Sequence, residues 1–417
     1  MTSLLQAKGE HVLSCEVGKG RYGEATMNAV AGRVCRAAQH SKGPACPPGI
    51  KVLLSILPAG TAESVDVVSD GTWDSLRGPV TGSDFFAGET YDASLELPAY
   101  ARPGFGNATL LAKVAVNGSG LEAPYATIPV RSSWLLPPIK VISRHPTIAS
   151  WTPAGAPAST RLFDVGQNMA GLVELQVPTS ACRGGLELRM HFAEAIHGPN
   201  GSLYHHITGI STEISTFSCD DSSVSASATG VVTYRSRWTQ MGYRYIEINQ
   251  TSGGDERSST TTAVADFDWG AVNVTGLFVS AGFDVGRESS FNCSDPLTNR
   301  IQLATLAAAR SNWLSFPTDC PQRERAGWLG DAHVGSETVL RNLHAVGGYR
   351  LFLEMIAEEL NSEGNPPDVV PFLGGHGGGG TPTWTAAFPI IAGLVVNYTA
   401  DARVAAQLYG PMQRFVQ

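Results

Sequence analysis

The chain has 417 residues, of which 43% are hydrophobic, and carries a formal net charge of −8. Its length exceeds what one hydrophobic core usually supports, so we expect several domains. The acidic balance, with no long basic run and no apolar run long enough to span a bilayer, argues against nucleic-acid and membrane partners and favours a neutral or weakly polar substrate.

Up to about residue 285 the sequence is typical of β structure. Alternating and β-branched runs, separated by Gly, Pro, Ser and Asn, include HVLSCEV, IKVLLSIL, GLVELQV and YRYIEI. Strands joined by short polar turns are typical of β-sandwiches. Prolines near residues 132–141 interrupt the pattern. We therefore expect one β-sandwich over residues 1–132, incomplete at its start, and a second over residues 133–287.

After residue 288 the pattern changes to helices. The first helical segment, SDPLTNRIQLATLAAARSNWL, begins with a Ser or Asp cap and has a proline in its first turn. It places Leu297, Ile301, Ala304 and Ala308 on one face, as in an amphipathic helix. Helical patterns continue to the last residue without a final cap, so we expect residues 288–417 to be a truncated helical domain.

Asparagine and cysteine usage favours a secretory history. Seven of the 14 asparagines begin an Asn-x-Ser/Thr sequon, a larger share than composition alone gives. The seven cysteines form neither a tight disulfide framework nor a metal-binding CxxC pair. Cys35 with Cys46 and Cys182 with Cys219 are candidate local bridges. A secreted protein is favoured, although the N-terminus has no visible signal-peptide pattern.

The charged residues gather in the stretch PTDCPQRERAGWLGDA, residues 317–332, between the first two helical segments. We expect a loop that runs into a helix. If the segment is helical from Glu324, then Trp328 and Asp331 share its face. Carboxylates accept hydrogen bonds from sugar hydroxyls, and an indole offers a flat apolar face to a sugar ring. A carboxyl held among like charges also has a raised pKa, which a general acid requires.

Other interpretations of the motif stay open at this point. The same residues fit a solvated loop in which Arg323 and Arg325 pair with nearby acids while Trp328 packs in the core. No histidine stands at metal-ligand spacing near the motif, so we expect neither a metal nor a cofactor. The sequence also lacks a G-x-S-x-G elbow for serine hydrolase chemistry.

The stretch PTDCPQRERAGWLGDA closely resembles the signature of the α-L-rhamnosidases of glycoside hydrolase family 78. Other segments are similar to that family in the same order. GEHVLSCEVGKGRYG and SDGTWDSLRGPV resemble its N-terminal β-sandwich, FDVGQNMAGLVELQV and MHFAEAIHGPNGSLY its second, and FNCSDPLTNRIQLAT the start of its (α/α)6 barrel. The resemblance covers residues 10–400 approximately. It implies a multidomain fold of two β-sandwich domains followed by the first part of an all-α (α/α)6 barrel.

The resemblance also implies an activity. Members of this family release terminal α-L-rhamnose from glycosides or polysaccharides with inversion of configuration. Glu324 matches the general acid of the family. The family residues that surround the bound rhamnose match Asp319, Arg323, Trp328, Asp331 and Trp384. The general base of the family is a glutamate that lies farther along the barrel, and no acid of this chain matches it.

The sequence departs from the family pattern in several places, among them a glycine-rich insert, GGHGGGG, just before Trp384. The motif reads QRER where many relatives have QRDER, and Thr385, Ala386 and Ala387 replace the usual small-acidic-alanine pattern after Trp384. Three alternatives remain: an inactive fragment, a non-catalytic carbohydrate-binding protein, and a related helical-barrel hydrolase for another deoxy sugar. The oligomeric state is left open.

Overall fold

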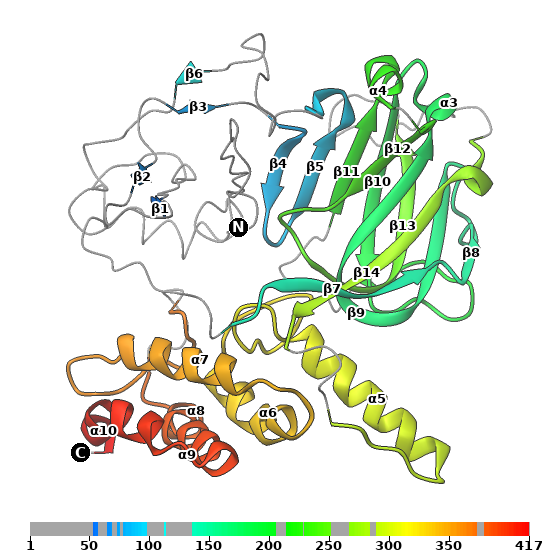
Figure 1. Ribbon diagram of the computed structural model, residues 1–417. Helices are drawn as coiled ribbons and strands as arrows, with labels where there is room; N and C mark the ends of the chain where they lie inside the picture. Colours follow the sequence, from blue (N-terminus) through cyan, green and yellow to red (C-terminus); the bar gives the residue numbers. More distant parts are fainter. Residues whose placement is uncertain are drawn as a thin grey trace.

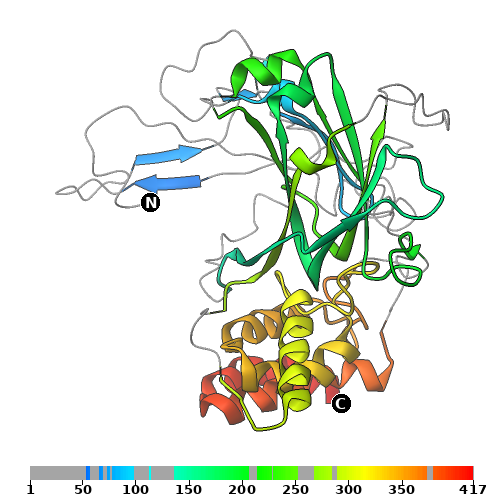
Figure 2. The ribbon, with the colours of Figure 1, turned by 90° about the vertical axis from the view of Figure 1, so that its right-hand side faces the viewer.

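The computed structural model describes residues 53–56, 65–68, 73–75, 78–97, 112–113, 136–205, 214–227, 229–251, 267–283, 289–372 and 379–416. These residues form a curled β-sheet and a group of helices at one end of it (Figure 1, Figure 2). The multidomain order of β structure followed by helices agrees with the sequence prediction. Most of the expected first β-sandwich, including Cys35 and Cys46, lies outside the described residues.

The curled sheet has ten strands in the order β4-β5-β11-β10-β13-β9-β14-β7, and β8 and β12 also pair with β9. The strands are β4 (Val80–Asp84), β5 (Gly88–Asp92), β7 (Ile139–Pro146), β8 (Ala149–Trp151), β9 (Thr160–Pro178), β10 (Leu186–Ala193), β11 (Ile214–Cys219), β12 (Val231–Arg235), β13 (Met241–Thr251) and β14 (Asn273–Ala281). The long strand β9 pairs with β13 and β12 along one edge and with β8 and β14 along the other. Most buried hydrophobic residues of the sheet form one core, and Leu162, Ala193 and Leu203 form a second, smaller cluster. Two smaller pairs are β1 (Leu53–Ile56) with β2 (Val65–Val68), and β3 (Asp74–Ser75) with β6 (Ala112–Lys113).

The core of the curled sheet follows from the alternation that the sequence shows. In β10, Leu188, Met190 and Phe192 are buried, while the residues between them are half-buried. The hairpin β4–β5 joins this core because β5 pairs in parallel with β11 and carries Tyr91, whose ring lies 4.9 Å from that of Tyr234. Residues on the N-terminal side of the expected 132/133 boundary therefore complete the sheet. The boundary itself stays a prediction.

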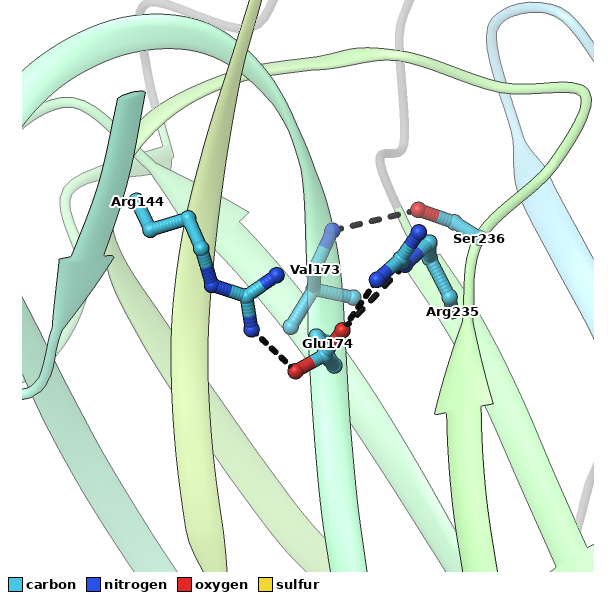
Figure 3. A network of polar contacts seen from close by, with 5 residues as sticks. All are labelled: Arg144, Val173, Glu174, Arg235 and Ser236. Carbon is cyan, nitrogen blue, oxygen red and sulfur yellow. Dashed lines mark hydrogen bonds and ion pairs between the residues drawn. The ribbon is translucent and has the colours of Figure 1, made fainter. Parts of the chain in front are cut away.

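Glu174 on β9 ties three strands of the curled sheet together (Figure 3). Its carboxylate accepts hydrogen bonds from Arg235, its cross-strand neighbour on β12, and from Arg144 on β7. Burial would raise the pKa of Glu174, but the two guanidinium groups outweigh it, so the pKa is lowered. Beside this network, the hydroxyl of Ser236 accepts a hydrogen bond from the backbone N–H of Val173 at 3.1 Å. A carboxylate that is nearly buried is in this way held in its ionised form.

The predicted bridge between Cys182 and Cys219 is confirmed. Cys182 ends α3 (Thr179–Cys182), and Cys219 ends β11 just before α4 (Asp221–Ala226). Both cysteines are buried. The bridge closes the end of the sheet at which β10 begins, because Leu186 of β10 pairs with Cys219.

The helices are α5 (Pro296–Ser311), α6 (Leu329–Asn342), α7 (Val346–Glu358), α8 (Pro382–Thr385), α9 (Ala387–Thr399) and α10 (Ala402–Val416). Their shared core includes Leu340, Phe352, Phe388 and Ile391, all buried. Among the described residues, no helix is both long enough and apolar enough to cross a lipid bilayer.

Helix α5 begins as the sequence predicts, but its packing differs from the expectation. Asp295 caps it by accepting hydrogen bonds from the backbone N–H groups of Leu297 and Thr298, with proline in the first turn. The face of Leu297, Ile301, Ala304 and Ala308 is exposed rather than buried. The helix instead packs through other residues, Leu306, Ala307 and Ala309. The heptad-like spacing marks an apolar face, but the neighbours that α5 meets decide which side is covered.

The helices are anchored to the end of the sheet at β14. Trp313, 1% exposed, stands edge-on between Phe283 and Tyr349, with ring centroids 5.1 and 4.6 Å away. The backbone N–H of Ala281 donates to the carbonyl of Trp313 at 2.9 Å. The buried hydroxyl of Ser311 accepts a hydrogen bond from the backbone of β9. This anchor fixes the segment that follows α5, which is the charged motif.

Candidate active site

The motif forms a closed loop between α5 and α6, as its sequence predicts. The backbone N–H of Asp319 donates to the carbonyl of Ala326 at 3.0 Å. In return, the backbone N–H of Ala326 donates to Oδ1 of Asp319 at 3.0 Å. The turn between these two residues carries Arg323 and Glu324, and both of these side chains are exposed. Two hydrogen bonds therefore close the loop, and Glu324 points to solvent from it.

Glu324 and Trp328 are brought together, although not on one helix face as the spacing predicts. Helix α6 begins at Leu329, so Glu324 lies in the preceding turn and Trp328 is the residue before the helix. The indole Nε1 of Trp328 donates to Oε2 of Glu324 at 2.9 Å. This hydrogen bond orients the carboxyl group. Asp331 lies in the first turn of α6 and is exposed.

Trp384, the second tryptophan expected at the site, lies beside Trp328. Its ring lies edge-on to that of Trp328, with centroids 6.5 Å apart. It covers Gly330, where an added Cβ would lie 2.7 Å from the ring. Helices α6 and α8 are joined near this point by a hydrogen bond between Nε2 of His333 and the carbonyl of Thr383. The glycine in α6 thus allows the two indoles to meet.

The carboxyl of Asp319 accepts its hydrogen bonds from within the loop. Its Oδ1 accepts from Ala326, and its Oδ2 accepts from the thiol of Cys320 at 2.9 Å. Burial raises the pKa of the Asp319 carboxyl, and the charge of nearby Glu324 adds to the rise, against the lowering by these two hydrogen bonds. The pKa of Asp319 is therefore raised mainly by burial, and only in smaller part by the like charges that the sequence predicts within the motif.

Two residues of the site were missed by sequence reasoning. Arg325, considered only as a partner for surface acids, is 1% exposed and bonds to backbone carbonyls. Asp368 is 8% exposed and accepts hydrogen bonds from Thr381 Oγ1 at 2.7 Å and, through its carbonyl, from the N–H of Leu329 at 2.9 Å. No local pattern marks either residue as buried, because burial depends on other segments of the chain: Arg325 also donates to the carbonyl of Phe85, and Asp368 is held by Thr381 and Leu329.

The arrangement combines the exposed carboxyl of Glu324, two indole rings and the carboxyl of Asp331 in the first turn of α6. A carboxyl oriented by an indole is suited to proton transfer, and the indole faces are suited to apolar sugar surfaces. Within the described ranges, no group of three or more His, Cys, Asp or Glu side chains has the geometry to hold a metal ion.

Three family models match the chain in succession. They are the alpha-L-rhamnosidase N-terminal domain over residues 1–132, the bacterial alpha-L-rhamnosidase concanavalin-like domain over 155–266, and the bacterial alpha-L-rhamnosidase 6 hairpin glycosidase domain over 286–417. The motif and the six helices lie within the last of these ranges.

Curated relatives and solved structures are similar over most of the chain. An alpha-L-rhamnosidase of Formosa agariphila is 28% identical over 359 residues, which are 84% of this chain and 34% of that protein. One of Streptomyces avermitilis is 29% identical over 326 residues, 77% of this chain and 27% of that protein. The chain thus spans about a third of the length of the relatives that it matches.

Two solved structures have a similar fold. The alpha-L-rhamnosidase of Dictyoglumus thermophilum matches with a TM-score of 0.66 and 26% identity over 85% of this chain and 36% of that chain. The Streptomyces avermitilis alpha-L-rhamnosidase complexed with L-rhamnose matches with a TM-score of 0.70 and 24% identity over 87% of this chain and 32% of that chain. The second likeness concerns the fold alone.

Proposed function

The chain belongs to the α-L-rhamnosidases of the glycoside hydrolase family 78 type, and on that premise we propose that the protein hydrolyses terminal α-L-rhamnosides. The substrate is a rhamnose-containing glycoside or polysaccharide. The L-rhamnose held by the Streptomyces avermitilis relative supports this substrate class. The observation that carries the proposal is the exposed Glu324 carboxyl, oriented by the indole of Trp328 beside the ring of Trp384.

We further propose an inverting mechanism in which Glu324 is the general acid. Glu324 must carry a proton when the substrate binds, and it delivers that proton to the glycosidic oxygen as the bond to the sugar breaks. A second carboxylate then activates a water molecule on the opposite face of the ring. We assign none of the carboxylates of this chain to that base.

The remaining site residues are proposed to hold the sugar. The exposed Arg323 and Asp331 flank Glu324 in sequence and offer a donor and an acceptor to the rhamnose hydroxyls. Trp328 and Trp384 offer apolar faces to the ring. Asp319 is proposed to act at the same site. Because its oxygens already accept hydrogen bonds from Ala326 and Cys320, its main contribution is to keep the loop closed.

We also propose the finer architecture that the family implies, with β-sandwiches over residues 1–132 and 133–287 and the first part of an (α/α)6 barrel over residues 288–417. The ranges of the three family models support these divisions. The close packing of α6, α7 and α10 against α9 is compatible with helical hairpins of such a barrel.

The proposal is tested with the full-length protein and aryl α-L-rhamnosides. The wild-type protein should cleave them and leave aryl fucosides intact, and proton NMR of early time points should show β-L-rhamnose as the first product. Glu324→Gln should lower kcat by roughly 10²- to 10⁴-fold for a phenyl leaving group, the usual contribution of a general acid. Normal turnover by Glu324→Gln, or the α-anomer as first product, would contradict the mechanism. Binding of rhamnose without turnover would favour a carbohydrate-binding protein.

A further inference from the structure

The loop that carries Glu324 rests on the curled sheet as well as on the helices. Gln322 of the loop lies directly over Gly242 of β13. A Cβ at Gly242 would stand 2.6 Å from Cβ of Gln322 and 2.8 Å from its Cα. No side chain other than hydrogen fits at this point of β13. The glycine therefore allows the backbone of the loop to approach the backbone of the sheet.

Arg325 makes a second contact between the loop and the sheet. Its guanidinium donates to the carbonyl of Phe85, which lies in the turn between β4 and β5. It also donates to the carbonyls of Pro321 at 3.0 Å and Gln322 at 3.3 Å within the loop. The charged group lies 5.2 Å from the ring centroid of Phe85 and 5.7 Å from that of Phe86.

The burial of Arg325 makes these contacts necessary. At 1% exposed, its guanidinium has lost its water and needs protein acceptors in compensation. The planar fork of arginine reaches several carbonyls at once, and a lysine ammonium cannot reproduce that geometry. The aromatic faces of the β4–β5 turn add attraction for a desolvated cation. Removal of the guanidinium would leave three carbonyls with one partner fewer and a gap beneath the loop.

Arg325 also has an uncommon backbone conformation. Its φ is +49°, in the left-handed region that residues other than glycine rarely adopt. A conformation of this kind persists where the surroundings hold it in place. Because Arg325 directly follows Glu324, its strained backbone and anchored side chain fix the direction in which the Glu324 side chain leaves the loop.

We propose that Arg325 is a positioning residue, which together with the β4–β5 turn and Gly242 aims the Glu324 carboxyl at the glycosidic oxygen. This inference rests on the proposed role of Glu324 as general acid. In this arrangement the curled sheet is a part of the active-site architecture. Misplacement of a catalytic group by about 1 Å costs on the order of 10²-fold in rate.

The experiment compares leaving groups in the full-length protein. Proton donation matters for a phenyl or alkyl rhamnoside and matters little for a 2,4-dinitrophenyl rhamnoside, whose leaving group departs as the anion. The ratio of kcat for the two substrates therefore reports the alignment of Glu324. A variant that only lowers the folded fraction reduces both rates equally and leaves this ratio unchanged. The variants are Arg325→Met, Arg325→Lys and Gly242→Ala, and the matched controls are Arg341→Met and Gly335→Ala.

Both control positions lie on α6 beyond its first turn. Arg341 is exposed on α6, where its guanidinium pairs with Glu337 and also interacts with Tyr398 of α9. Gly335, also on α6, has open space where a Cβ would be added. Both controls should keep the leaving-group ratio and the rates of the wild type.

For the phenyl substrate, Arg325→Met and Gly242→Ala should each lower kcat roughly 10²-fold, with a change of at most about threefold for the dinitrophenyl substrate. Arg325→Lys should not restore the ratio. If Arg325→Met does not fold, Gly242→Ala decides the outcome. A wild-type ratio in the folded variants, with a shifted ratio in Glu324→Gln, would overturn the positioning role alone. A wild-type protein without activity, or a wild-type ratio in Glu324→Gln, would instead overturn the proposed function.

Discussion

The disulfide between Cys182 and Cys219 gives a stability prediction whose magnitude follows from the structure. The two cysteines are 37 residues apart in sequence and close a loop that contains β10 and β11. In the chain-entropy model, a loop of this length lowers the entropy of the unfolded chain by about 13 cal/mol/K, which is about 4 kcal/mol at 25 °C. With a urea m-value of about 2 kcal/mol/M, loss of the bridge should lower the unfolding midpoint by about 2 M.

The assay must follow the curled sheet itself, since a chain of several domains need not unfold in one step. Pulsed hydrogen exchange with mass spectrometry on peptides from β9, β10 and β13 reports this transition in a urea series. The wild type with and without reductant is compared with the double variant Cys182→Ala/Cys219→Ala. Cys293→Ala, which removes a free thiol, is the control.

The double variant should unfold at the midpoint of the reduced wild type or slightly below it, because its smaller side chains also lose buried contacts. It should no longer respond to reductant in these peptides, whereas Cys293→Ala should behave like the wild type. A bridge that mass spectrometry finds intact in the oxidised wild type, but whose reduction moves the midpoint by less than about 0.5 M, would show that it does not stabilise the sheet as expected.

Three further predictions concern pH and packing. Burial and the charge of Arg189 lower the pKa of His191 to about 4. The folded protein should therefore lose up to about 3 kcal/mol of stability as the pH falls from 6.5 towards 4. Urea titrations at each pH should show a smaller loss for His191→Gln. The pKa of Asp319 is raised, so ionisation of this carboxyl costs stability once the pH exceeds the ordinary pKa of an aspartate. Asp319→Asn should therefore be more stable than the wild type at pH 7 and lose that advantage below pH 3.8. No such gain is expected if the carboxyl is solvated. Gly330→Ala should displace Trp384 and raise KM for aryl rhamnosides at least about tenfold. Gly335→Ala should leave KM unchanged. Equal KM values for Gly330→Ala and the wild type would show that the contact between Gly330 and the indole of Trp384 is dispensable.

Much of the local structure was predictable because it depends on neighbouring residues. Alternating runs gave the strands of the curled sheet, and the Asp-Pro start gave the beginning of α5. The short spacing of Cys182 and Cys219 suggested their bridge, which the structure contains. The motif indicated a loop that runs into a helix. It also predicted that Glu324 and Trp328 lie close together, and in the structure the two side chains form a hydrogen bond.

What only the tertiary structure decided concerns contacts between distant parts of the chain. Phe85 and Arg325 are separated by 240 residues, so no spacing rule marks the arginine as buried or the β4–β5 turn as its support. The same holds for Gly242 beneath Gln322 and for the exposed face of α5. Periodicity identifies the faces that are apolar or charged. The packing of the helices and strands decides which of these faces is covered and by which residues. A local sequence pattern does not specify how those elements are placed relative to one another.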